Sequence, residues 1–271
     1  MKSKTGYEPK YKMDREANVF WAKRNIVDYI WKSANLEGIA VTFPETNAIY
    51  NGVAVEGCSV ENIVKINNLK HAWQFLFDTL DYPIDYGYIC KLHQIVGANS
   101  IYNAGYIRSV PVSMGGTKWK PELPIESVVK EEVAEIVIED NPLERALDLS
   151  LYCMRKQMFI DGNKRVAMLA ANQIMISNGM GVLSVSQENI DEFGEKLIYF
   201  YETGKNEEIK RFLYEKCIDG ENIELKTQNF DKMTPNYTEE YYKRKSKEYA
   251  EKNRQSIEKG QWIQNGDNLE R

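Results

Sequence analysis

The 271-residue sequence has few of the residues that build metal clusters or disulfide frameworks. Two histidines exclude a His-rich metal site, and the four cysteines show no CxxC spacing, so we interpret them as reduced thiols of a cytoplasmic protein. No apolar run reaches the roughly 18 residues that a membrane helix needs. The polar N-terminus lacks the apolar stretch of a signal peptide. The sequence therefore predicts a cytoplasmic protein without membrane contact.

An excess of positive charge is also missing. The net charge is −5, whereas proteins that hold nucleic acid by bulk charge are basic, so we do not expect such binding. The composition is ordinarily globular, with 43% apolar and 28% charged residues, and the chain is long enough to bury a substantial core.

Helical patterns dominate the chain after a first dozen residues that we expect to be an unstructured arm. Apolar periodicity, N-cap residues such as Ser59 and Asn141, and Pro142 at a first helical position mark the elements. Helices are predicted over residues 13–36, 46–50, 59–80, 83–97, 142–157, 163–178, 187–203 and 206–217. The helix after residue 163 is apolar nearly all round, so it should be central and buried.

Two segments depart from the helical pattern. In residues 105–124, apolar residues flank Gly115-Gly116 and prolines frame the segment, which predicts a small β-hairpin. Residues 226–271 hold 10 Lys/Arg and 8 Asp/Glu with few aliphatic residues. We interpret them as a charged tail with a solvated helix around 239–258, or alternatively as an appendage that binds a partner. The predicted fold class is all-α with one small hairpin.

The most informative segment is the turn from Gln157 to Arg165. Free N–H groups at the start of the second helix and the helix dipole form an anion site, which Gly162 leaves open. Arg165 can bind phosphate oxygens in bidentate fashion, and Asp161 can hold a hard cation such as Mg²⁺. On residue types alone, a turn that merely reverses the chain with solvated charges is an equal alternative.

Residues 157–165 resemble the signature of the Fic family, HxFx(D/E)GN(G/K)R, in all but the first position. Gly105–Arg108 and the following residues resemble the family's flap, the hairpin on which a target protein docks. The flap residues are Val112, Ser113, Met114, Gly115, Gly116, Thr117, Lys118 and Trp119. The resemblance covers about residues 45–218 and implies a Fic-type helical fold, also called the Fido fold.

The family's usual reaction is transfer of AMP from ATP to a protein hydroxyl, so the resemblance implies ATP and Mg²⁺ as ligands. It implies that Asp161 binds Mg²⁺ and that Asn163 and Arg165 contact phosphates. The implied nucleotide-binding residues are Phe159, which anchors the loop, Gly162, Asn163, Lys164 and Arg165.

Gln157 stands where the family has its catalytic His, the general base. Glutamine has no usable proton affinity near pH 7, so we expect AMP transfer to be weak or absent. His93 and His71 are interpreted as structural residues, and neither is a convincing replacement base.

Many Fic proteins also carry an inhibitory helix with the pattern (S/T)xxxE(G/N), whose Glu pairs with the last Arg of the signature. Residues 46–51 fit this pattern except that Tyr50 replaces Glu, so we interpret Thr46, Tyr50 and Asn51 as a degenerate inhibitory motif. A neutral phenol forms no ion pair with Arg165, so we expect no inhibition from it. A core-packing turn without regulatory role is the alternative, and Glu56-Gly57 offers a rival but poorer register.

The sequence thus predicts an N-terminal arm and helical extension (1–44), a Fic domain (45–218) and a charged tail (219–271). The predicted function is an adenylyltransferase-like protein with reduced or altered catalysis that docks a protein target on its flap. A non-catalytic binding module and a Doc-like phosphotransferase remain alternatives, and a homodimer is also open.

Overall fold

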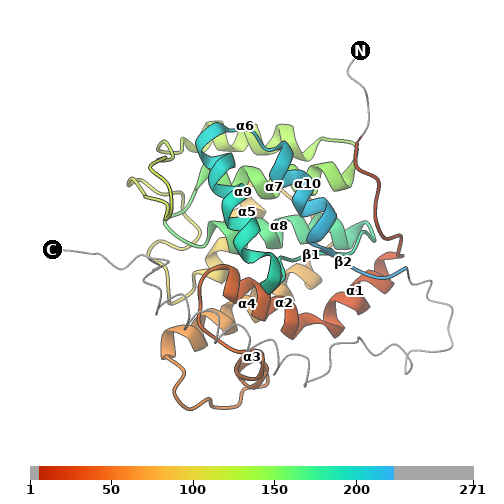
Figure 1. Cartoon of the computed structure of the whole chain (residues 1–271), viewed down its shortest axis with the longest axis vertical. Coiled ribbons are helices and arrows are strands. Elements are labelled where there is room, and N and C mark those ends of the chain that lie inside the picture. Colours follow the sequence, from red (N-terminus) through yellow and green to blue (C-terminus); the bar gives the residue numbers. More distant parts are fainter. Residues whose placement is uncertain (1–5, 223–271) are drawn as a thin grey trace.

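The computed structural model describes residues 6–222, so the interpretation of residues 226–271 lies outside the described residues. The chain forms a mostly helical bundle with one two-stranded sheet (Figure 1). The helices are α1 (Arg15–Arg24), α2 (Ile26–Leu36), α3 (Phe43–Tyr50), α4 (Val60–Asp78), α5 (Tyr86–Val96), α6 (Glu126–Val137), α7 (Pro142–Lys156), α8 (Asn163–Ser177), α9 (Ile190–Thr203) and α10 (Glu207–Lys216), with a 3-10 turn at Gln187–Asn189.

Helix α8 is the centre of the bundle, as its apolar sequence predicts. All of its residues except Lys164 and Ser177 are buried. It packs against α7 over most of its length, and α1, α4 and α5 contact it from other sides. Figure 1 shows α6, α9 and α10 around the α7 half of the bundle and α1 to α4 around the other half.

The predicted caps explain where the helices begin. The Ser59 hydroxyl accepts a hydrogen bond from Asn62 N–H at the start of α4. The Asn141 side chain accepts two backbone N–H groups of the first turn of α7, where Pro142 holds the first helical position. Gly38, with φ 72°, follows the end of α2 in the left-handed conformation that glycine adopts without strain. The predicted helix over residues 13–36 divides at Asn25 into α1 and α2.

The predicted hairpin at residues 112–119 is wrong. Gly115-Gly116 do form a turn, but the flanking residues form no strands within the described part of the chain. Pro111 and Pro121 cannot donate ladder hydrogen bonds. The segment instead leans on α9, where the Thr117 hydroxyl donates to Glu202 at 2.7 Å. The two strands lie elsewhere, with β1 (Val182–Leu183) antiparallel to β2 (Ile218–Asp219).

Two further regions differ from the sequence prediction. Helix α6 was not predicted, because it buries only a narrow stripe, Val129 and Val133, and follows a proline-rich segment. The described part of the N-terminal arm has no regular structure but is held in place. Tyr7 N–H donates to Glu144, its ring stacks on Tyr214, and Met13 N–H donates to Gly179 O.

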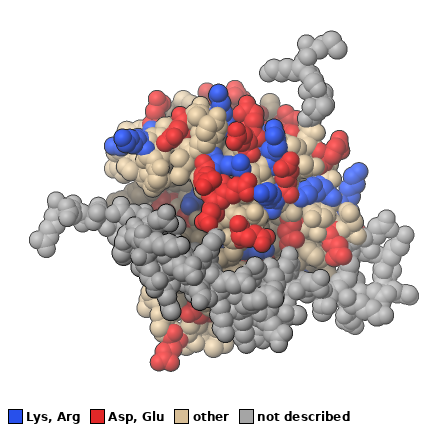
Figure 2. All heavy atoms as spheres, in the orientation of Figure 1, with Lys and Arg blue, Asp and Glu red and all other residues tan. Residues whose placement is uncertain are grey.

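The surface agrees with the absence of bulk positive charge. Acidic and basic side chains are interspersed on the face that Figure 2 shows. None of the helices within residues 6–222 is both long and apolar enough to cross a membrane.

Candidate functional site

The turn between α7 and α8 is built around the side chain of Asn163. Its Oδ1 accepts the Phe159 N–H at 3.0 Å, and its Nδ2 donates to Phe159 O at 2.9 Å and to Gln157 Oε1 at 3.0 Å. Both amide hydrogens are therefore used inside the loop. The structure gives Asn163 a positioning role, and a phosphate contact from this residue would have to come from its backbone.

Gln157 ends α7 in the left-handed conformation, with φ 48° and ψ 56°. Its side chain is buried, donates from Nε2 to Met154 O at 2.6 Å and lies 3.4 Å from the Tyr201 hydroxyl. Burial, followed by the charge of Glu37, raises the pKa of Tyr201. Neither the neutral amide nor this phenol is a base near pH 7.

Helix α8 supplies no negative charge of its own at its N-terminus. Gly162 is its N-cap, with φ 78°, and a glycine has no side chain to accept the first-turn N–H groups. The first turn carries Lys164 and Arg165, so α8 itself supplies no carboxylate to its positive end. A Cβ on Gly162 would lie 3.2 Å from Ile101 and 3.4 Å from the Arg165 guanidinium. This helix end is therefore open to an anion from outside.

The guanidinium of Arg165 is only 2% exposed and points into this site. Its Nη2 binds Asp161 Oδ2 at 2.9 Å. Its Nε and Nη1 are buried and have no hydrogen-bond partner in the part of the chain that the structure describes. Buried unpaired donors are costly, by about 1–3 kcal/mol each. Both donors are therefore available to further acceptor oxygens.

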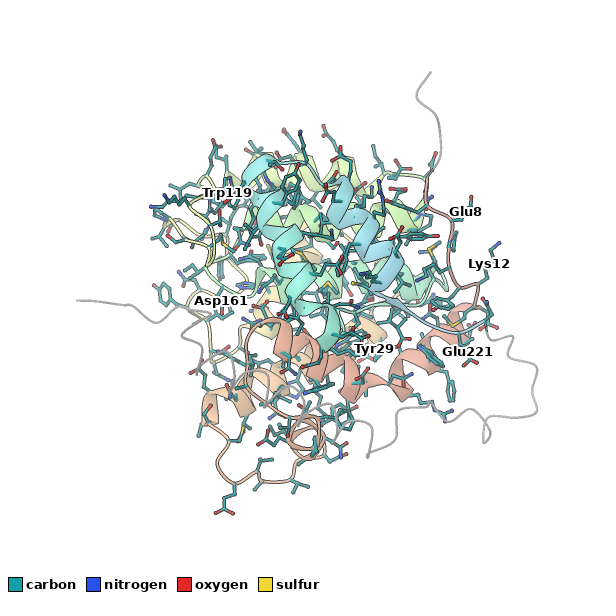
Figure 3. The ribbon with its side chains drawn as sticks, viewed as in Figure 1. Glu8, Lys12, Tyr29, Trp119, Asp161 and Glu221 are labelled. Atoms are coloured by element: carbon teal, nitrogen blue, oxygen red, sulfur yellow. The ribbon has the colours of Figure 1, made fainter. Side chains whose placement is uncertain are left out.

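Asp161 lies at the exposed end of the same loop, on the side of the helical core where Figure 3 also labels Trp119. Its side chain is 54% exposed. Burial alone would raise the pKa of Asp161, but the Arg165 guanidinium and the Gly162 N–H outweigh it and hold the pKa below its ordinary value. The carboxylate is therefore ionised at neutral pH and accessible to a cation.

His93 supports the loop from α5. Its ring stacks on Phe159 with centroids 3.8 Å apart. Its Nδ1 accepts the Gly105 N–H at 2.7 Å, so Nε2 carries the proton and donates to Asp161 O at 3.0 Å. Burial lowers the pKa of His93 to about 4. These contacts are typical of a structural residue, and His71 is exposed on α4.

The flap is attached to the loop at its base. The buried Arg108 guanidinium donates to Gln157 O at 2.6 Å and to the carbonyls of Val110 and Glu122, which flank the flap on its two sides in the sequence. Near its far end, Trp119 stacks on Tyr201, with centroids 5.2 Å apart. The flap therefore lies on the surface beside Gln157, although it forms no hairpin.

Residues 46–51 do not reach the site. Tyr50 accepts a hydrogen bond from Lys70 Nζ at its carbonyl, and its ring lies under the same ammonium group. Thr46 is fully buried and donates to Thr42 O. Asn51 caps the end of α3 with a bond to Asn47 O. These residues contact neither Asp161 nor Arg165, and their local contacts favour the alternative of a core-packing turn.

The carboxylate that does reach Arg165 belongs to Glu37, at the end of α2. Glu37 Oε1 accepts the Arg165 backbone N–H at 3.1 Å and lies 3.7 Å from Arg165 Nε. Its side chain is 11% exposed. Glu37 therefore occupies the anion site at the N-terminus of α8.

Sequence analysis missed this residue, although a signal for it was present. Residues 33–38 read SANLEG and satisfy every position of the inhibitory pattern (S/T)xxxE(G/N). The segment also fits the end of an amphipathic helix, and it lies outside the predicted Fic domain, residues 45–218.

Comparison with known proteins agrees with the resemblance. Residues 83–175 match the sequence model of the Fic/DOC family. The sequence is 27% identical over 179 residues to protein adenylyltransferase fic-1 of Caenorhabditis briggsae. That match covers 61% of this chain and 34% of the relative, so the chain corresponds to about a third of the relative's length.

Solved structures share the fold. Fic-1 from C. elegans superposes with a TM-score of 0.60 at 20% identity, covering 86% of this chain and 65% of that one. A Fic domain-containing signaling protein from Bacteroides thetaiotaomicron superposes with a TM-score of 0.61 at 18% identity, covering 73% and 84%. The mostly helical Fic fold is confirmed, residues 83–175 match the Fic/DOC family model, and the sequence is distantly similar to the adenylyltransferase fic-1.

Proposed function

We propose that this protein binds ATP at the start of α8 and is a Fic-type adenylyltransferase whose activity is lowered by two separate features. Gln157 replaces the general base, and Glu37 occupies the site of the outer phosphates. The observation that carries the proposal is the buried Arg165 guanidinium. Two of its donors make no hydrogen bond among the described residues, and they lie beside a helix N-terminus where a carboxylate from another helix is bound.

The chemistry of the anion site favours phosphate. The Arg165 guanidinium and the N–H groups of the first turn of α8 form a donor set that suits several oxygens of one ligand. Glu37 supplies one carboxylate there, whereas a polyphosphate would supply enough acceptors for Nε and Nη1 of Arg165 as well. ATP binding therefore requires the Glu37 side chain to leave.

Asp161 suits the Mg²⁺ that such a reaction uses. It is an ionised, accessible carboxylate, and Mg²⁺ is commonly held by one or two carboxylates together with substrate phosphates. Within residues 6–222 there is no cluster of three His, Cys, Asp or Glu side chains that would hold a metal alone. The ion would neutralise phosphate charge, and Asp161 would hold it beside the loop.

AMP transfer joins the oxygen of a target hydroxyl to the α-phosphorus and breaks the bond to the β-phosphate oxygen, which releases pyrophosphate. The hydroxyl proton must go to a base. Gln157 cannot take it, and its amide is already bonded to Met154 O and Asn163. We therefore expect slow transfer, since a positioned general base contributes about 10²–10⁴-fold.

The flap is the proposed docking place for a protein target. It is attached to Gln157 through Arg108, and its backbone is free of strand partners within the described residues. An extended target segment could therefore add main-chain hydrogen bonds to it.

Incubation of the full chain and of Glu37→Ala with Mg²⁺ and ATP labelled at the α- or the γ-phosphate tests the proposal. Label from the α-phosphate on protein supports AMP transfer. Label from the γ-phosphate alone indicates a Doc-like phosphotransferase, which the Lys in Asn163-Lys164-Arg165 keeps open. ATP binding without transfer indicates a binding module. Absence of calorimetric binding at millimolar ATP in a folded Glu37→Ala protein contradicts the proposal.

A further inference from the structure

A second contact joins the ends of α2 and α8, and it comes from Lys164. The last turn of α2 contains no basic residue to interact with its carboxyl end. Lys164 Nζ donates to Leu36 O, the last carbonyl of α2, at 3.1 Å. The same ammonium group lies 3.7 Å from Glu37 Oε2. Lys164 therefore interacts with α2 rather than extending into solvent, where a lysine on a helix surface normally lies.

The two helix ends cap each other. The positive end of α8 receives the carboxylate of Glu37, and the negative end of α2 receives the ammonium group of Lys164. Lysine at a helix C-terminus binds free carbonyls and is favoured by the dipole, whereas lysine in a first turn is disfavoured unless an anion is near. Each helix thus supplies the charge that the other lacks.

We propose that Lys164 is a positioning residue that holds Glu37 in the anion site by capping the carboxyl end of α2. The proposal rests on the proposed function in one respect, that the anion which competes with Glu37 is the phosphate of ATP. It assigns to Lys164 the opposite effect from a phosphate ligand, because a residue that stabilises the Glu37-bound state opposes ATP.

The sign of a substitution distinguishes these two roles. If Lys164 only binds phosphate, Lys164→Gln weakens ATP binding whether or not Glu37 is present. If Lys164 holds Glu37, Lys164→Gln strengthens ATP binding in the native background. Once Glu37→Ala has removed the competing carboxylate, Lys164 has nothing to hold, and the gain disappears.

Titration calorimetry with Mg²⁺ and ATP on four full-length proteins measures this: native, Lys164→Gln, Glu37→Ala and the double variant. We expect Lys164→Gln to raise ATP affinity about three- to tenfold in the native background, which corresponds to the usual net contribution of one hydrogen bond. In the Glu37→Ala background it should bring no gain. Lys164→Arg, which keeps a cation at this position, should stay close to native.

The matched control is Lys130→Gln, because Lys130 is an exposed helix lysine that pairs with Glu126 on α6, away from α2. It should leave ATP affinity unchanged. An equal change of either sign on Lys164→Gln in both backgrounds overturns the proposal, as does no change in either.

Hydrogen exchange without nucleotide gives an independent readout. The N–H groups of Glu37, Gly38 and Ile39 bond back to the last turn of α2. Lys164→Gln should speed their exchange several-fold, and Lys130→Gln should not. Unchanged exchange overturns the proposal. Faster exchange in a protein that binds no ATP in any of the four forms leaves the Lys164 contact standing and refutes the proposed function instead.

Discussion

The ends of α2 and α3 have similar sequences and very different positions. Residues 33–38 and 46–51 each begin with a hydroxyl residue and end with Gly or Asn. Glu37 reaches the Arg165 N–H and approaches its guanidinium, whereas Tyr50 lies against Lys70 on α4. Figure 1 shows α3 at the end of the molecule opposite α6, with α2 and α4 between it and α8.

The difference shows that the six-residue pattern does not determine a role by itself. The role depends on which groups lie next to the end of the helix that carries the pattern. Both segments form helices with conventional ends. The end of α2 meets the positive end of another helix, which lacks an anion, and α3 meets a lysine that is satisfied by a carbonyl and a ring. Glu37 differs from Tyr50 because its helix end faces the positive N-terminus of α8, and the sequence pattern alone does not provide this.

The largest expected effect comes from restoring the missing base. Gln157→His in a Glu37→Gly background should raise AMP transfer, read as self-modification, by about 10²–10⁴-fold. Histidine suits the site because it tolerates the left-handed backbone better than most residues. With Glu37 intact the gain should be much smaller, because its carboxylate holds the Arg165 N–H. Equal activity of Gln157→His with and without Glu37 would contradict the inhibitory role.

Lowering the pH should destabilise the turn between α7 and α8, which His93 supports. Because His93 has a pKa of about 4 when folded and about 6.5 when unfolded, the unfolded chain binds more protons between these values. The free energy of unfolding should therefore fall by about 3 kcal/mol as the pH drops from 6.5 to 4. Urea titrations of the native protein and of His93→Gln at several pH values measure this. The free energy of unfolding of the variant should lack the part of the pH dependence that comes from His93.

The exposed His71 gives the matched control for this measurement. His71→Gln should keep the full pH dependence, since its ring has no buried contact to lose. If His93→Gln and His71→Gln have the same slope, the buried neutral imidazole is not the cause.

A smaller effect is expected when the inhibitory pattern is removed from α2 and completed on α3. Glu37→Ala should raise ATP affinity about tenfold, because it removes a charge-assisted hydrogen bond that competes with phosphate. Adding Tyr50→Glu to that variant completes the pattern on α3. It should not lower the ATP affinity again, because position 50 does not reach Arg165. Calorimetry on the two proteins decides this, and recovery of native affinity in Glu37→Ala/Tyr50→Glu would show that position 50 does reach the site.

The smallest effect should come from the start of α3. The Thr42 hydroxyl and the Glu45 carboxylate form a capping box there. Thr42→Ala should lower the free energy of unfolding by about 1 kcal/mol and leave ATP affinity unchanged. Thr42→Ser keeps the cap and should be nearly neutral in urea titrations. A change in ATP affinity on Thr42→Ala would mean that α3 supports the site after all.

Elements with strong local signals were predictable, and elements that depend on distant partners were not. Caps at Ser59 and Asn141 and the apolar surface of α8 predict their helices because the signals lie within each segment. Helix α6 escaped prediction because only Val129 and Val133 are buried. The flap pattern predicted strands, but contacts with α9 replaced strand pairing.

The sequence by itself determined the turn from Gln157 to Arg165, the glycine that precedes α8 and the glutamine at the first position of the signature. These properties follow from residue types and spacing within nine consecutive positions. Only the tertiary structure decided which carboxylate lies at the N-terminus of α8, because Glu37 and Arg165 are 128 residues apart and meet through the packing of α2. The same packing brings Lys164 onto the end of α2. A helix dipole attracts any nearby charge of opposite sign, and the fold determines which charge is near.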